Sequence, residues 1–181
     1  MIKSLLIILT IIFSLNIQAQ HTEKFLELSK SLKAIDSSTV IRKYSNGNTK
    51  EITKYLKYEY GDYTYEFISG FNRLYLKNGK MISELEYDKF GNILTEKGFN
   101  KEGEIYRLVE TVLIDTKSES LNDCLNSDRN LIISQETYLL SDGGELFLWQ
   151  KGKKLGKKKI GIWKTYNQCD ESVKLKDYTK K

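Results

Sequence analysis

Side chains able to hold an anion gather near the C-terminal end of the chain. Lysine ammonium groups supply positive charge, and the aromatic rings interleaved with them can contact cations or a lipid interface. This composition fits anionic lipid headgroups, lipopolysaccharide phosphates or acidic polysaccharide. The candidate ligand-binding residues are Lys151, Lys153, Lys154, Lys157, Lys158, Lys159, Trp163 and Tyr166.

A purely structural role explains the same residues without any ligand. Trp163 and Tyr166 would then point inward from a strand, while the lysines would fill exposed turns and keep the sheet edge from pairing with other chains. In that strand Ile160 and Ile162 alternate with Gly161 and Trp163, so Trp163 is expected to face away from the isoleucines. Both interpretations stay open on the sequence alone.

Catalytic chemistry has few candidates. The single histidine, His21, stands where a chain terminus is expected to be loose, so nucleophilic triads and histidine-based metal sites lack a base or a ligand set. The lysines at 157–159 stand between glycines but lack the Gly-Lys-Ser/Thr ending of a phosphate loop. We therefore expect no enzymatic activity, no metal and no cofactor.

Paired carboxylates leave one remote alternative, a carboxylate-only glycoside hydrolase. All of the candidates but Glu104 stand in short alternating or mixed-charge patterns, where the ordinary role of a carboxylate is a solvated face or a cross-strand ion pair with lysine. The residues concerned are Glu84, Glu86, Glu96, Glu104 and Glu110.

The first residues predict export. Lys3 precedes an apolar run from Leu5 to Leu15 that is too short to span a bilayer with ordinary flanks, and Ala19 suits a cleavage site. We predict a Sec-type signal peptide over residues 1–19; an uncleaved anchor is the alternative. Because no cysteine stands at the cleavage point, we do not expect a lipoprotein. The mature protein should lie in the periplasm, at the cell surface or outside the cell, without a transmembrane segment and without nucleic acid as a partner.

Composition fits one folded domain over residues 20–181. The formal net charge is +5 and falls to +4 when Lys3 leaves with the signal peptide (5 − 1), which is a modest basic excess. Aromatic residues make up 12% of the chain and proline is absent, which argues against a disordered tail. In an oxidising compartment the two cysteines favour a disulfide between Cys124 and Cys169; two unpaired thiols are the alternative.

Hydrophobic periodicity predicts a short helix followed by strands. Phe25, Leu28, Leu32 and Ile35 share one helical stripe, so a helix is expected over about 23–35 as a lid on a sheet. From residue 39 the period changes to two, as in YTYEF at 63–67. We predict hairpins over about 39–113, a polar loop over about 115–130, and further hairpins over about 131–178.

Glycine-centred turn signals separate the predicted strands. Gly79, Gly91 and Gly103 stand twelve residues apart, and each supplies the positive φ that a tight hairpin turn requires. An interval of that length holds one strand and one turn. The predicted fold is therefore mainly β, a single antiparallel meander of β-hairpin repeats with a short N-terminal helix.

One segment resembles the bacterial variant of the MORN repeat, whose core reads Gly-(basic or polar)-x-x-Gly-x-Trp-x-x-Tyr. The matching residues are Gly156, Lys157, Lys158, Gly161, Trp163 and Tyr166. Cys169 and Asp170 depart from the pattern, so the array should end there. A second stretch, YDKFGNILTE at 87–96, is similar to the Tyr-Asp repeats of large secreted bacterial toxins. Both resemblances imply antiparallel hairpins used for binding or encapsulation, and some MORN-variant proteins are called antitoxin-like.

These features together predict an exported, non-catalytic β-repeat binding or scaffold module of the bacterial cell envelope. Its expected partner is anionic lipid or polysaccharide, held by the lysine and tryptophan residues. The alternative is a protein that binds another envelope protein through its sheet edge or its N-terminal helix.

Overall fold

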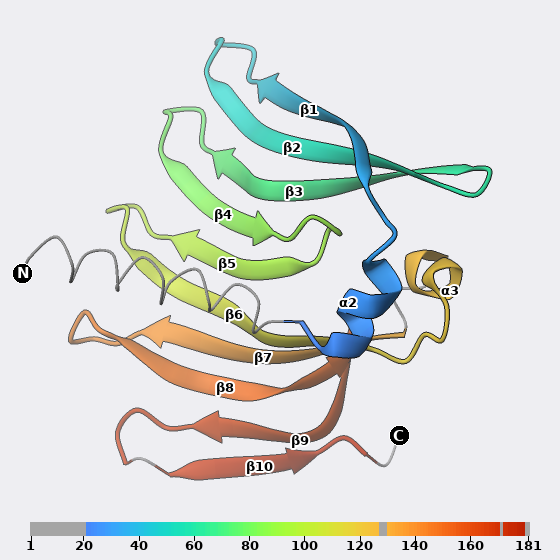
Figure 1. Cartoon of the computed structure of the whole chain (residues 1–181). Coiled ribbons are helices and arrows are strands. Elements are labelled where there is room, and N and C mark those ends of the chain that lie inside the picture. Colours follow the sequence, from blue (N-terminus) through green and yellow to red (C-terminus); the bar gives the residue numbers. More distant parts are fainter. Residues whose placement is uncertain (1–20, 127–129, 171, 180–181) are drawn as a thin grey trace, which may run out of the picture.

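A computed structural model of the chain describes residues 21–126, 130–170 and 172–179. The predicted signal peptide at 1–19 lies outside these residues. Within them, ten strands form one antiparallel sheet whose spatial order follows the chain, which confirms the mainly β meander (Figure 1). No helix in the described ranges has the length and apolar character needed to span a membrane.

The first six strands cover the region predicted for the repeat hairpins, and the last four cover the predicted C-terminal hairpins. The six are β1 (Ala34–Lys43), β2 (Thr49–Tyr60), β3 (Tyr63–Tyr75), β4 (Met81–Tyr87), β5 (Ile93–Phe99) and β6 (Ile105–Thr116). The four are β7 (Leu131–Leu140), β8 (Leu146–Leu155), β9 (Lys158–Tyr166) and β10 (Val173–Asp177). The helices in the described part of the chain are α2 (Glu23–Ser29) and α3 (Leu121–Asn126).

Five of the described turns share one hydrogen-bond pattern. In each, the first residue donates its N–H to the carbonyl of the fifth, and a glycine at the fourth position donates back to the carbonyl of the first. The predicted turn glycines Gly79, Gly91 and Gly103 have φ of 84°, 84° and 90°, a region that other residues rarely adopt. The turns span 44–48, 76–80, 88–92, 100–104 and 141–145. The twelve-residue interval therefore reflects one turn geometry repeated along the sheet.

Helix α2 is shorter than the sequence predicted. Thr22 caps its N-terminus by accepting a hydrogen bond from the Phe25 N–H, and the helix ends at Ser29 rather than near residue 35. Phe25 and Leu32 are buried, but Ile35 already belongs to β1 and is 53% exposed. Pairing with β2 from Ala34 onward replaces the last predicted turn of helix.

The hydrophobic core lies between the two helices and one end of the sheet. Phe25 of α2 packs with Leu94 and Ile114, from β5 and β6. A neighbouring cluster joins Leu32, Tyr58 and Leu121, the last from α3 within the predicted polar loop. This arrangement gives α2 the lid position that the amphipathic stripe predicted, and it places a second helix, α3, inside the segment predicted as a polar loop (Figure 1).

The predicted disulfide is not formed. Cys124 and Cys169 are both free thiols. Cys124 lies in α3, beside one end of the strands, while Cys169 lies in the turn between β9 and β10 at the opposite end (Figure 1). Because a disulfide needs Cα atoms within about 7 Å of each other, this placement rules out the bridge in this structure.

Candidate functional site

The sheet divides the predicted lysine cluster between its two faces. Lys151 pairs directly with Lys164 across β8 and β9, and Lys154 pairs with Lys159. Since neighbouring residues of a strand point to opposite faces, Lys153 shares the face of Lys151 and not that of Lys154. Two of the remaining candidates, Lys157 and Lys158, lie in the β8–β9 turn and at the start of β9. The predicted residues therefore do not form one patch.

Trp163 has a structural role on the face opposite Lys151 and Lys153. Its side chain is 4% exposed and lies over Gly152, where an added Cβ would stand 2.4 Å from the indole Cδ2. The indole Nε1 donates to the Lys153 carbonyl at 2.9 Å, and the Lys159 Nζ lies 3.9 Å from the ring centroid. Trp163 is thus held by the sheet itself. It faces away from Ile160 and Ile162, as the alternation predicted.

Lys154 shares the face of Trp163 in a crowded, positively charged environment. Burial lowers the pKa of its ammonium group, and repulsion from Lys159 and Arg107 lowers it further. Arg107 is itself ion-paired with Glu96. These contacts pack Lys154 and Lys159 against neighbouring side chains of the Trp163 face.

The opposite face carries a shallow groove of about 470 Å³ across β6 to β9. Its walls are partly apolar, because the aliphatic side chains of Val112 and Ile162 line it, and these residues are 49% and 58% exposed. A register shift in the β8–β9 pairing at this point accompanies Gly161, whose φ is 61°. The lining residues are Val112, Ser134, Gln135, Glu136, Lys151, Gly152, Lys153, Ile160, Gly161, Ile162 and Lys164.

Charge in this groove is positive and only partly compensated. The Lys151 Nζ lies 3.5 Å from the Glu136 Oε1. Interactions with Tyr166, which has the larger effect, and with Glu136 raise the pKa of Lys151. Lys153 and Lys164 are exposed and make no ion pair or side-chain hydrogen bond within the described residues. Three lysines and one glutamate give the groove a formal charge of +2 (3 − 1). Two ammonium groups are therefore free to meet an anion.

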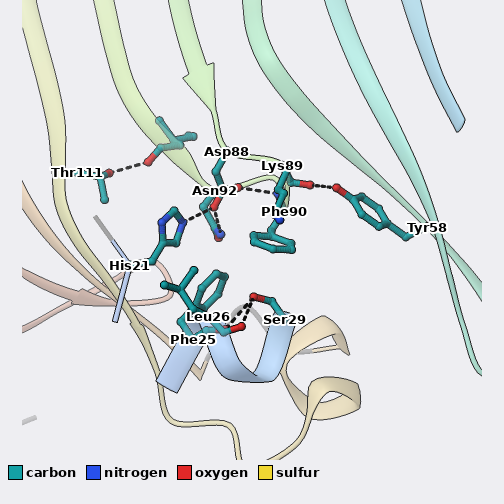
Figure 2. Close-up of polar contacts among 11 residues, drawn as sticks. His21, Phe25, Leu26, Ser29, Tyr58, Asp88, Lys89, Phe90, Asn92 and Thr111 are labelled. Atoms are coloured by element: carbon teal, nitrogen blue, oxygen red, sulfur yellow. Dashed lines mark hydrogen bonds and ion pairs between the residues drawn. The ribbon is translucent and has the colours of Figure 1, made fainter. Parts of the chain in front are cut away.

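A second constellation, which the sequence did not predict, surrounds His21. Figure 2 shows the imidazole pointing at Asp88 in the β4–β5 turn, with Nε2 2.8 Å from Oδ2. The His21 ring also stacks on Phe25, with centroids 5.2 Å apart. His21 forms a parallel bridge to Ile114, and the next N–H, that of Thr22, donates to the Ile114 carbonyl. The expectation of a loose terminus at His21 is therefore wrong.

Unequal strand lengths create the place that His21 occupies. The pairing of β5 with β6 starts at Thr95, which lies opposite Glu110, so the C-terminal part of β6 extends beyond this pairing. His21 and Thr22 lie along this extension, and Thr22 Oγ1 also donates to Asp115. The sequence could have indicated this position for His21 only through the different ends of β5 and β6, and periodicity alone does not show where either strand ends.

Asp88 is the first residue of one of the five repeated turns. Its Oδ1 accepts hydrogen bonds from the Phe90 and Asn92 N–H groups, and its Oδ2 accepts from His21 and from the Asn92 amide. The Asp88 side chain is 6% exposed. At the matching position of an outward turn, Asn100 makes the same two backbone contacts but is more exposed. Burial of one turn beneath α2 thus coincides with a carboxylate and a histidine partner.

A cavity of about 230 Å³ lies next to this cluster, between the helices and the sheet. Its wall is mainly apolar and includes Phe25 and Phe90, whose rings meet edge to face (Figure 2). Cys124 also lines it, and burial raises the pKa of that thiol. Within the described residues no hydroxyl or thiol is hydrogen-bonded to His21, so the histidine has no paired nucleophile there.

Four of the five carboxylates considered for hydrolysis have ordinary partners on the sheet, while Glu110 lies opposite Glu136 across β6 and β7. Glu84 accepts from both Arg73 and Lys97, at 2.8 Å and 3.2 Å. Others engage neighbouring side chains: Glu86 with Thr95, Glu96 with Arg107, and Glu104 with Asn100. Among the described residues no group of three or more metal-binding side chains could hold a metal ion.

Comparison with known proteins found no matching family, no matching curated protein and no matching solved structure. The resemblance to hairpin-repeat families is therefore untested beyond the hairpin architecture itself.

Proposed function

We propose that the protein is an exported, non-catalytic binding module of the bacterial envelope whose groove on β6 to β9 holds an anionic, partly apolar ligand. An anionic lipid headgroup with its adjoining acyl chain is the ligand class that this chemistry fits best. The sheet acts as the scaffold. Of the eight predicted ligand-binding residues, Lys151 and Lys153 line this groove.

One observation carries the proposal: two unpaired lysines flank exposed aliphatic side chains in one groove. Lys153 and Lys164 have no partner within the described residues, and Ile162 and Val112 lie exposed beside them. Ammonium groups attract lipid phosphates, and each lysine near an anionic membrane surface contributes about 1 kcal/mol. Exposed aliphatic groups favour an amphiphile over a fully polar chain because they gain from losing contact with water.

Acidic polysaccharide is the second ligand that the free lysines could serve. It would use the same charges but would leave Val112 and Ile162 in contact with water or sugar. The two ligands therefore differ in how binding should respond when an aliphatic wall residue becomes polar. Replacement of Ile162 by threonine is expected to weaken lipid binding and leave polysaccharide binding unchanged.

Sedimentation of purified mature protein with vesicles tests the proposal. We expect it to bind vesicles containing an anionic lipid at low salt, to release them at high salt, and to ignore zwitterionic vesicles, because the attraction is electrostatic and screened by ions. Lipopolysaccharide and an acidic polysaccharide are assayed in parallel. Failure to bind any of the three, or binding that is indifferent to salt, would refute the groove as an anion site.

A further inference from the structure

We propose that the outer edge of β1 pairs with β1 of a second copy of the chain, in antiparallel register about Thr39. Two sheets would then continue into one across a two-fold axis. This inference concerns a surface separate from the groove, which lies on β6 to β9. It stands whether or not the groove binds an anion.

The edge at β1 is long and open. Among the residues that the structure describes, β1 is the first strand in the sheet order and pairs on one side only, and all ten of its residues are exposed. Three large apolar side chains lie in the strand: Ile35 at 53% exposure, Val40 at 40% and Ile41 at 56%. An edge of this kind presents a row of free N–H and C=O groups that a second strand can satisfy.

The opposite edge of the sheet differs in the way that protects against pairing. β10 has five residues, of which Lys174, Lys176 and Asp177 are charged. Charged residues on a short edge strand discourage addition of another chain. In β1 the central stretch SSTVI at 37–41 has no charge, no glycine and no proline, and it ends in three β-branched residues. Of the two edges, β1 is therefore the one suited to association.

Geometry restricts the register of such a pair. In an antiparallel pair, two opposed residues either both direct their N–H and C=O groups at the partner strand or both direct them away, and the two cases alternate along the strand. In a pair of identical strands, the numbers of two opposed residues must therefore differ by an even number. A strand that pairs with its own copy about a two-fold axis thus places one residue opposite itself. The pairing of β1 with β2 is regular from Asp36 to Arg42, with shifts at either end. Thr39 is the midpoint of that regular stretch. Only a register about Thr39 lets the whole stretch pair with its copy.

This register brings opposite charges together. Asp36 lies opposite Arg42 of the partner copy, and the two-fold axis repeats the pair, giving two cross-strand ion pairs. Arg42 is 64% exposed and uses Nη1 to reach Glu51 at 3.1 Å, so other guanidinium donors remain for a second carboxylate. Asp36 uses Oδ1 for the Ser37 N–H, which leaves Oδ2. Opposed charges of this kind stabilise a strand pair by roughly 0.2–1 kcal/mol each.

The contact is small for an interface. Stable complexes bury about 1,200–2,000 Å² in total, and a single strand edge falls short of that area. We therefore expect a reversible dimer that forms as the protein concentration rises, rather than a permanent one. A dimer would present two grooves at once, which would strengthen attachment to a surface without any new contact.

Sedimentation velocity across a range of protein concentrations tests the proposal. We expect the mature protein to shift from monomer to dimer as concentration rises. Asp36→Arg should abolish the shift because it places two arginines opposite each other, and Asp36→Arg with Arg42→Asp should restore it by exchanging the charges. Lys176→Glu on β10 serves as the control and should leave the shift unchanged, and circular dichroism verifies folding of each variant.

Three results would overturn the inference. They are a protein that stays monomeric at every concentration, a dimer that survives Asp36→Arg, and a folded double variant that fails to recover association. Vesicle binding measured on the monomeric Asp36→Arg variant keeps this test distinct from that of the groove, since the lysines there are untouched.

Discussion

His21 and Asp88 stand 67 positions apart in the chain, yet their side chains meet at 2.8 Å between Nε2 and Oδ2. The contact joins the segment that precedes α2 to a hairpin turn in the middle of the sheet (Figure 2). It also fixes the position of α2, whose Phe25 stacks on the same histidine. The lid over the sheet is thus held from its first residues onward.

Replacing Asp88 by asparagine should lower the free energy of unfolding by about 1–3 kcal/mol, because an amide cannot accept all the hydrogen bonds of a buried carboxylate. Urea unfolding measures the loss. Asp142→Asn is the matched control, since it makes the same replacement in an exposed turn where the side chain has no hydrogen bond within the described residues, and it should shift stability by less than about 0.5 kcal/mol.

A double-mutant cycle with His21→Ala isolates the contact itself. We expect a coupling energy of about 0.5–3 kcal/mol between positions 21 and 88, as for other directly bonded side chains. Additive effects of the two changes would mean that His21 and Asp88 do not stabilise each other in solution.

Gly152→Ala should disturb the packing of Trp163. The added Cβ would lie 2.4 Å from the indole, so the ring has to move, and overpacking of this kind typically destabilises by about 1–3 kcal/mol. Tryptophan fluorescence should report the movement. Gly143→Ala is the control, because the nearest atom to its Cβ would be 3.7 Å away. Equal stability of the two variants would show that Trp163 does not lie over Gly152.

The two cysteines should react separately with thiol reagents under non-reducing conditions. Cys169 is exposed and should react quickly, while Cys124 should react slowly because it is partly buried and burial raises the pKa of its thiol. Raising the pH should accelerate labelling of Cys124 as more thiolate forms. Mass spectrometry assigns the sites; a peptide pair joined through Cys124 and Cys169 would contradict the arrangement of free thiols.

Glu84→Gln should weaken the sheet at neutral pH and reduce its sensitivity to acid. Burial alone would raise the pKa of Glu84, but hydrogen bonds from Arg73 and Lys97 outweigh it and hold the pKa below the ordinary value of 4.5. Because the pKa of Glu84 is lower in the folded state, its ionised form stabilises the fold fully above the unfolded-state pKa. This stabilisation is lost as the pH falls through the folded-state pKa. We expect Glu84→Gln to lower the free energy of unfolding by about 1 kcal/mol at pH 7 and by less below pH 4.5. Urea unfolding at several pH values across this range measures both losses. A constant difference between the two proteins at all pH values would contradict this role.

Period-two alternation and glycine spacing were enough to predict the antiparallel meander. Gly79, Gly91 and Gly103 have the positive φ that the turn signals required, and β7 begins at Leu131 where the second group of hairpins was expected. The helix was overestimated because Ile35 fits the helical stripe as well as it fits a strand. Only its distant partner strand, β2, decides between them.

The candidate site was less predictable because it depends on which way each side chain points. The lysines between 151 and 159 are close in sequence, but strand alternation sends Lys153 and Lys154 to opposite faces. The shifted pairing near Gly161 then places Ile162 and Lys164 in the groove, and such a shift has no clear sequence signature. His21 was missed for a related reason: its partner Asp88 is brought near only by the complete sheet.

Vesicle binding by two matched lysine variants tests the proposed groove most directly. Lys153→Glu with Lys164→Glu changes the groove, and Lys157→Glu with Lys158→Glu makes the same change in net charge at the β8–β9 turn. Loss of two lysine contacts at about 1 kcal/mol each should weaken binding to anionic vesicles about 30-fold, so the groove variant should lose at least that much. The turn variant should stay close to the unaltered protein. Equal weakening by both variants, or no effect of either, would contradict a ligand site in the groove.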